Sequence, residues 1–130
     1  MTIHEVAKKL NLTQDTLRFY EKNGLLGHIA RDKSGYRDYT EQDLKRIEFI
    51  KCMRSAELSI EVLKKYMELY DRGKDTGEER KQLLIEQKKL LDCKIETMKQ
   101  ASKRLETKIR LYEEGKLDNY LESNKQKKDF

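Results

Sequence analysis

Cysteine is scarce in this chain, whose 130 residues include only Cys52 and Cys93. Two cysteines are too few for a disulfide framework, so we expect reduced thiols, which are typical of cytoplasmic proteins. The sequence also has no signal peptide and no apolar run long enough to cross a membrane. These absences predict a cytoplasmic protein without a membrane partner.

Motifs for catalysis and metal binding are missing as well. The sequence contains no Gly-rich phosphate loop, no His/Glu metalloprotease spacing and no nucleophile elbow. His4 and His28 are isolated, whereas a metal site needs several Cys or His ligands that converge. We therefore expect neither an enzyme nor a protein that holds a metal or another cofactor.

Apolar residues make up only 36% of the chain, against 41% charged residues. This composition is typical of long exposed helices, so we expect a partner chain to supply part of the buried surface. The net charge is +5, and residues 1–58 carry 11 basic and 9 acidic residues. The charge therefore permits nucleic-acid binding without demonstrating it.

Residues 2–24 carry the signals of two short helices joined by a tight link. The first helix begins with a capping box formed by Thr2 and Glu5. The second begins at a cap, Thr13, and stops at Gly24, which tolerates a left-handed backbone. These signals predict a helix-turn-helix, although two short amphipathic helices are by themselves a common pattern.

The second helix has an outer face that suits DNA. If Leu17 faces the core, Tyr20 and Glu21 share its side, and amides and cations occupy the opposite side. Amides suit base edges, and cations suit both base edges and phosphates. The DNA-binding residues predicted in this helix are Gln14, Thr16, Arg18, Phe19, Tyr20 and Lys22.

Residues 25–39 lack a helical pattern and predict a small hairpin, or wing, around a Ser34-Gly35 turn. Aromatic hydroxyls and guanidinium groups beside such a turn can both reach phosphates. A solvated loop is the alternative. The DNA-binding residues predicted here are Arg31, Lys33, Ser34, Gly35, Tyr36 and Arg37.

Two further helices follow the wing. Thr40 caps the third helix, and Ser59 caps the fourth, which Gly73 closes. The link between them, residues 54–58, adds Arg54 to the predicted DNA-binding residues. The core-facing residues expected in these helices are Leu44, Ile47, Ile50, Ile60, Leu63, Tyr66, Met67 and Tyr70.

A last helix is expected over residues 77–113, opened by a capping box from Thr76 to Glu79. Apolar residues recur through it with heptad spacing, which predicts a coiled-coil seam that joins two chains. A single amphipathic helix packed on its own domain is the alternative. The predicted dimerisation residues are Leu84, Leu91, Ile95, Met98, Leu105, Ile109 and Tyr112.

Three motifs, in this order, are Thr16-Leu17-Arg18-Phe19-Tyr20-Glu21-Lys22-Asn23-Gly24-Leu25-Leu26, Gly35-Tyr36-Arg37-Asp38-Tyr39 and Asp43-Leu44. Together they resemble the MerR family of bacterial transcription regulators over roughly residues 1–70. The sequence departs from the family at Phe19, where the family has Tyr, and at Glu57, where it usually has Gly.

The resemblance implies a mainly α fold. A winged helix-turn-helix DNA-binding domain over 1–72 would be followed by an antiparallel coiled-coil dimerisation helix over 76–114 and a short tail over 115–130. We expect the tail residues Leu117, Tyr120 and Leu121 to form a short element that folds back. The family also implies a homodimer that binds and distorts double-stranded promoter DNA, with RNA polymerase as a further partner.

The inducer is the least determined feature. Metal-sensing, redox-cluster and drug-binding relatives need residues or domains that this chain lacks. The context of Cys52, residues 53–61, instead resembles a MerR subgroup that responds to aldehydes and other small electrophiles through one cysteine in the DNA-binding half. A packed, inert cysteine is the alternative, because free cysteine is often buried.

Two other functions fit the same pattern. One is an architectural or recombination-accessory DNA-binding protein without an inducer. The other is a coiled-coil adaptor whose N-terminal domain binds protein. Sequence-specific, saturable binding would favour a regulator over the first, and absence of DNA binding would favour the second.

Overall fold

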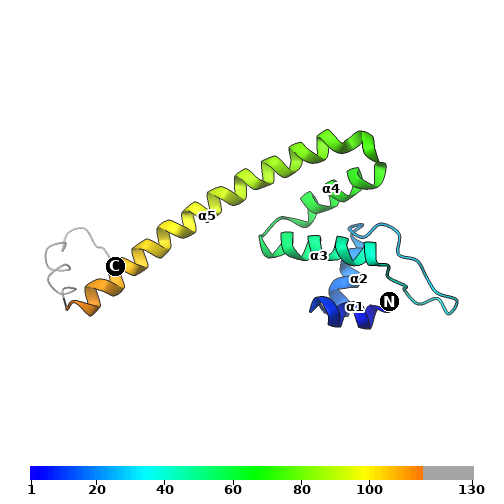
Figure 1. Cartoon of the computed structure of the whole chain (residues 1–130), viewed down its shortest axis with the longest axis horizontal. Helices are drawn as coiled ribbons and strands as arrows, with labels where there is room; N and C mark the ends of the chain where they lie inside the picture. The colour runs from blue at the N-terminus through cyan, green and yellow to red at the C-terminus, as the bar shows by residue number, and fades with distance from the viewer. Residues whose placement is uncertain (116–130) are drawn as a thin grey trace. The chain divides into compact units, whose positions relative to one another are not determined.

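The computed structural model describes residues 1–115, so the predicted tail element at Leu117, Tyr120 and Leu121 lies outside the described residues. The helices are α1 (Ile3–Leu10), α2 (Gln14–Lys22), α3 (Glu41–Ser55), α4 (Ile60–Arg72), the short 3-10 turn η1 (Lys74–Thr76) and α5 (Gly77–Glu113), as Figure 1 shows. The predicted mainly α fold is confirmed. Two compact units, Met1–Gln87 and the chain from Lys88 onward, are described separately.

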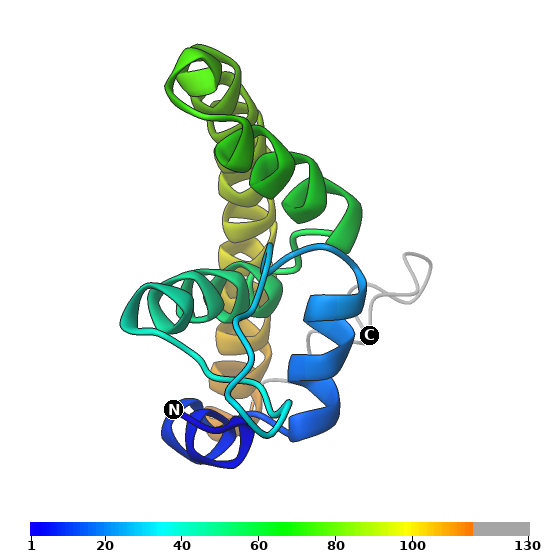
Figure 2. The same ribbon diagram turned by 90° about the vertical axis from the view of Figure 1, so that its right-hand side faces the viewer.

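Helices α1 and α2 begin where their capping residues predict. The Thr2 hydroxyl accepts the N–H of Glu5, and the Thr13 hydroxyl accepts the N–H of Thr16 at 3.0 Å. Asn11 ends α1 with a left-handed backbone (φ 54°), which lets the chain turn at once into α2. Figure 2 shows the two helices crossing at a large angle, which is the geometry of a helix-turn-helix.

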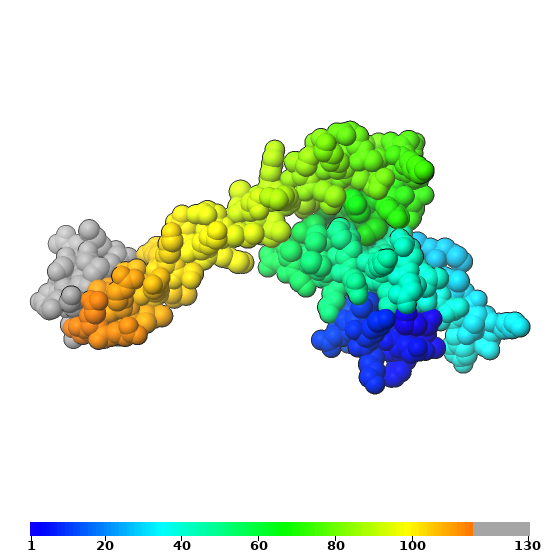
Figure 3. Space-filling view, viewed as in Figure 1, coloured from blue at the N-terminus to red at the C-terminus, as the bar shows by residue number. Residues whose placement is uncertain are grey.

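The wing is a hairpin reduced to one antiparallel bridge, between Arg31 and Arg37. Its turn is held by Asp32, whose carboxylate accepts the N–H groups of Ser34 (2.8 Å) and Tyr36 (3.0 Å). Gly35 has a φ of +85°, a conformation that costs a residue with a Cβ. Figure 3 shows the wing protruding from the first unit.

One hydrophobic core joins all the elements of the first unit except the tip of the wing. Its members come from α1 to α4 and from the segment after α2: Val6, Ala7, Leu10, Leu17, Tyr20, Leu25, Leu26, Ile29, Tyr39, Leu44, Ile47, Ile50, Leu58, Leu63 and Met67. Burying so many apolar side chains is the main driving force that holds α2 and the wing in place.

The apolar stripe of α4 differs from the expectation at one residue. Tyr70 is 44% exposed, whereas its neighbour Leu69 is buried. Arg46 and Arg80 lie over the Tyr70 ring, at 5.9 and 5.4 Å from its centroid, so the ring serves as a surface platform for cations. The prediction that Tyr70 faces the core was therefore wrong, because the next turn of chain packs on the Leu69 side instead.

The expected capping box at Thr76 was also wrong. Thr76 already lies inside the turn η1, so its backbone is helical and not the extended backbone of a cap. Its hydroxyl donates instead to the carbonyls of Leu69 (2.7 Å) and Gly73 (2.8 Å). The side chain therefore closes the corner between α4 and α5.

Helix α5 runs over the expected residues, and none of its side chains is buried. The apolar seam is largely open to solvent within the chain, with Leu105 65% and Tyr112 68% exposed. This exposure argues against the alternative of a helix packed on its own domain. Within residues 1–115, no helix combines the length and apolar character that crossing a membrane requires.

Candidate nucleic-acid interface

Arg18 is held along the outer face of α2 by its own helix. Its guanidinium donates to the carboxylate of Asp15 at 3.1 Å and to the side-chain carbonyl of Gln14 at 3.2 Å. The side chain is still 47% exposed, so it offers N–H groups to an approaching ligand. These contacts orient the guanidinium before any ligand binds, which lowers the ordering cost of binding.

The aromatic pair on α2 is divided between surface and core. Phe19 is 47% exposed, whereas Tyr20 is 5% exposed, and their ring centroids are 6.3 Å apart. Burial raises the pKa of Tyr20, and the charge of Arg54 partly opposes that rise. The burial of Tyr20 argues against its predicted contact with DNA, because its ring packs beneath α2 instead.

Both wing arginines form ion pairs with one carboxylate, Glu21 of α2. The Arg37 Nε lies 2.5 Å from Glu21 Oε1, and the Arg31 Nη2 lies 3.4 Å from Glu21 Oε2. The remaining predicted wing residues, Lys33, Ser34, Gly35 and Tyr36, are exposed around the turn. The structure thus brings α2 and the wing together through Glu21, a residue that the sequence analysis had placed on the core side.

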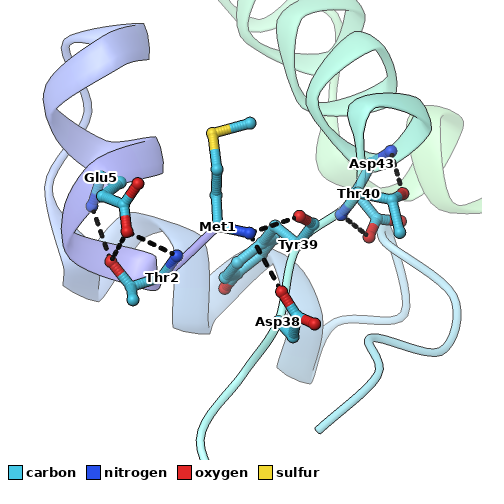
Figure 4. A network of polar contacts seen from close by, with 7 residues as sticks. All are labelled: Met1, Thr2, Glu5, Asp38, Tyr39, Thr40 and Asp43. Carbon is cyan, nitrogen blue, oxygen red and sulfur yellow. Dashed lines mark hydrogen bonds and ion pairs between the residues drawn. The ribbon is translucent and has the colours of Figure 1, made fainter. Parts of the chain in front are cut away.

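A polar network fixes the base of the wing to the start of α1 (Figure 4). The α-amine of Met1 donates to the carboxylate of Asp38 at 3.0 Å and to the carbonyl of Tyr39 at 2.8 Å. Thr40 follows directly and begins α3 with a capping box that includes Asp43. The wing is therefore anchored at its base on both α1 and α3.

The link between α3 and α4 keeps the backbone that glycine would favour. Glu57 has a φ of +69°, a left-handed conformation that is uncommon for a residue with a side chain. Arg54 donates to the carbonyl of Leu58 at 2.8 Å and braces the link from the other side. Glutamate at this position therefore leaves the turn intact and adds a negative charge to it.

Cys52 is exposed near the end of α3, which argues against a packed cysteine. It lines a surface hollow of about 380 Å³ together with Lys9, Leu10, Asn11, Glu48, Lys51 and Ser55. The Lys51 ammonium donates to the carbonyl of Leu10 at 2.6 Å and so ties α3 to the end of α1. Lys9, which the sequence analysis had not associated with Cys52, lines the same hollow.

The predicted dimerisation residues extend along α5. Leu84, Ile95, Met98, Leu105, Ile109 and Tyr112 are exposed, and Leu91 is half-buried. Lys88 interrupts the seam, but its ammonium pairs with Asp92 at 2.8 Å. Among residues 1–115, no group of His, Cys, Asp and Glu side chains could hold a metal ion.

Residues 1–69 match the family model of the MerR HTH family regulatory proteins, and residues 44–108 match a model described as MerR, DNA binding. The chain is 50% identical over 91 residues to the HTH-type transcriptional regulator AdhR of Bacillus subtilis (strain 168). That match covers 70% of this chain and 65% of AdhR. An uncharacterized HTH-type transcriptional regulator of Haemophilus influenzae is 35% identical over 115 residues, which are 88% of this chain and 85% of that protein.

Solved structures resemble the chain over most of its length. A putative MerR family transcriptional regulator from Listeria monocytogenes has a TM-score of 0.87 and 37% identity, covering 96% of this chain and 95% of that one. HiNmlR, a MerR family regulator lacking the sensor domain and bound to promoter DNA, has a TM-score of 0.80 and 34% identity, covering 89% and 92%.

Proposed function

Because this chain belongs to the MerR family of helix-turn-helix regulatory proteins, which are DNA-binding transcription regulators and not enzymes, we propose that it binds promoter DNA as a homodimer. The observation that carries the proposal is the preset guanidinium of Arg18 on the open face of α2. A 34% identical structure bound to promoter DNA supports the same use of this face.

Helix α2 and the wing divide the contacts in this proposal. Gln14, Thr16, Arg18, Phe19 and Lys22 face base edges and the adjoining backbone from α2. The wing from residue 31 to residue 37 and Arg54 of the following link face phosphates. Tyr20 supports α2 from the core and makes no direct contact.

The second copy would cover the exposed seam of α5. Each large apolar side chain moved from water to an interface contributes about 1.5–3 kcal/mol, and the seam carries several. An antiparallel pair of α5 helices would place two DNA-binding units at fixed separation, as a pseudo-palindromic site requires. Such a dimer distorts the promoter spacer and presents the bent DNA to RNA polymerase.

Cys52 is the proposed sensor of a small electrophile. Its exposure, its hollow and the neighbouring ammonium groups of Lys9 and Lys51 suit attack by a thiolate on an aldehyde or quinone carbon. The new sulfur–carbon bond would add bulk between the end of α1 and α3. Because Lys51 joins those two helices, the adduct would shift α1 and α2 relative to the link.

The test of DNA binding is footprinting on the protein's own promoter, followed by titration with Arg18→Ala. We expect a loss of about 1–3 kcal/mol if Arg18 makes a bidentate base contact. Lys65→Ala, an exposed cation on α4, is the matched control and should bind as wild type. Equal affinity of a folded Arg18→Ala variant would remove α2 from the interface. Binding without sequence preference would favour an architectural protein, and absence of binding an adaptor.

A further inference from the structure

Glu21 is the only acidic residue of α2 that faces the wing, and it pairs with both arginines at the wing's base. The chain separation is 10 residues to Arg31 and 16 residues to Arg37. A carboxylate between two predicted phosphate contacts is unexpected, because it neutralises the charge that would attract DNA. Its presence suggests that one of the two arginines has a task other than contact with DNA.

The two ion pairs differ in burial and in length. In the pair with Arg37, the side chains are 20% exposed for Glu21 and 23% for Arg37, and the atoms are 2.5 Å apart. Arg31 is 44% exposed, and its pair is 3.4 Å long. Withdrawing Arg37 would leave a partly buried carboxylate without its closer partner, which is strongly unfavourable. Withdrawing Arg31 would leave the shorter pair intact.

The surroundings of Arg37 also tie it to the wing's frame. Arg37 forms the one bridge of the hairpin, and the next residue, Asp38, donates its N–H to the carbonyl of Ala30 at 2.8 Å. Beneath the pair lies Tyr39, whose buried hydroxyl has no partner among the described residues. Burial raises the pKa of Tyr39, Arg37 lowers it and Glu21 raises it, so the hydroxyl lies within electrostatic reach of both.

We propose that Glu21 and Arg37 form a positioning pair that holds the wing against α2 before and after DNA binds, and that Arg31 is the arginine that leaves Glu21 to contact phosphate. This inference rests on the proposed function, since it assigns roles within the same DNA interface. Arg37 then acts through the wing, by placing the exposed turn around Gly35 where the backbone of DNA passes.

The test is the salt dependence of affinity for the footprinted promoter site. A lost phosphate contact reduces the slope of log K against log salt by about 0.9, whereas a lost positioning residue lowers affinity at every salt concentration without changing the slope. We expect Arg31→Gln to reduce the slope and Arg37→Gln to leave it unchanged. Arg72→Gln, an exposed arginine at the end of α4, is the control for general charge loss.

A charge-swapped variant, Glu21→Arg with Arg37→Glu, separates the two roles independently. It keeps the ion pair and the net charge, so a positioning pair should recover most of the affinity that Arg37→Gln loses. If Arg37 touched phosphate, the swap would place a carboxylate against DNA and bind worse than Arg37→Gln.

Three results would overturn the assignment. One is a slope for Arg37→Gln that falls as far as that for Arg31→Gln, and another is a swapped variant weaker than Arg37→Gln. Circular dichroism checks folding, and if Arg37→Gln does not fold, the swapped variant decides alone. Wild-type protein that shows no sequence-specific binding would overturn the proposed function itself, and this inference with it.

Discussion

Thr76 closes the corner between α4 and α5, and replacing it with valine should weaken the first unit measurably. The hydroxyl is 5% exposed as part of its residue and donates to the carbonyls of Leu69 and Gly73. It also accepts the Nε–H of Arg80 at 3.0 Å. Valine has nearly the same shape, so Thr76→Val removes these hydrogen bonds without opening a cavity.

The expected magnitude follows from the acceptor that is left behind. The Leu69 carbonyl belongs to the last turn of α4, where the N–H of Gly73 bonds to Tyr70 instead. A buried carbonyl that loses its partner costs about 1–3 kcal/mol. We therefore expect Thr76→Val to lower the free energy of unfolding by about 2 kcal/mol, and Thr76→Ser, which keeps the hydroxyl, to lower it by much less.

The assay is urea unfolding followed by circular dichroism, at one fixed protein concentration because dimerisation contributes to stability. Thr107→Val is the matched control, since the Thr107 hydroxyl also bonds to a carbonyl, that of Lys103, but on an exposed part of α5. We expect that control to change stability by less than about 0.5 kcal/mol. Equal effects of the two valine substitutions would refute the role assigned to the corner.

Four further outcomes are expected. Changing Leu91 and Leu105 together to Glu should give a monomer in sedimentation, and a variant that stays dimeric would place the interface elsewhere. Cys52→Ser should abolish the promoter response to an aldehyde or quinone and the adduct seen by mass spectrometry, and a full response would exclude sensing by this thiol. Glu57→Gly should raise stability by about 1 kcal/mol in thermal unfolding, because it relieves a left-handed residue. Burial raises the pKa of Tyr39 above 10.0, so its neutral form is favoured in the fold; stability should hold below pH 10 and fall as pH rises through the raised pKa, less steeply in Tyr39→Phe.

Local sequence signals were sufficient for the helices and their ends. Thr2, Thr13, Thr40 and Ser59 each accept the N–H of a residue three positions onward, so each cap needs only its own neighbours. The span of α5, residues 77–113, was predicted correctly for the same reason, because its heptad pattern lies within one helix. Three motifs in order also identified the family before any tertiary contact was known.

The candidate site could be predicted only in part. The outward positions of Arg18 and Phe19 follow from helical periodicity once Leu17 is placed in the core. Tyr20 lies on the same side as Leu17, and the motif alone had suggested a contact that its burial argues against. Resemblance to a motif assigns roles to positions, whereas burial depends on the elements that pack against them.

Tertiary structure alone decided which charges and hydroxyls are already bound. Glu21 meets Arg37 across 16 residues of chain, and Arg46 meets Asp71 across 25. Thr76 bonds to Leu69 because a 3-10 turn intervenes before α5, and Cys52 is exposed because α3 ends beside α1. Caps and heptads involve residues close in sequence, and periodicity records them; pairs between separate elements depend on how those elements pack around the shared core, which only the folded chain determines.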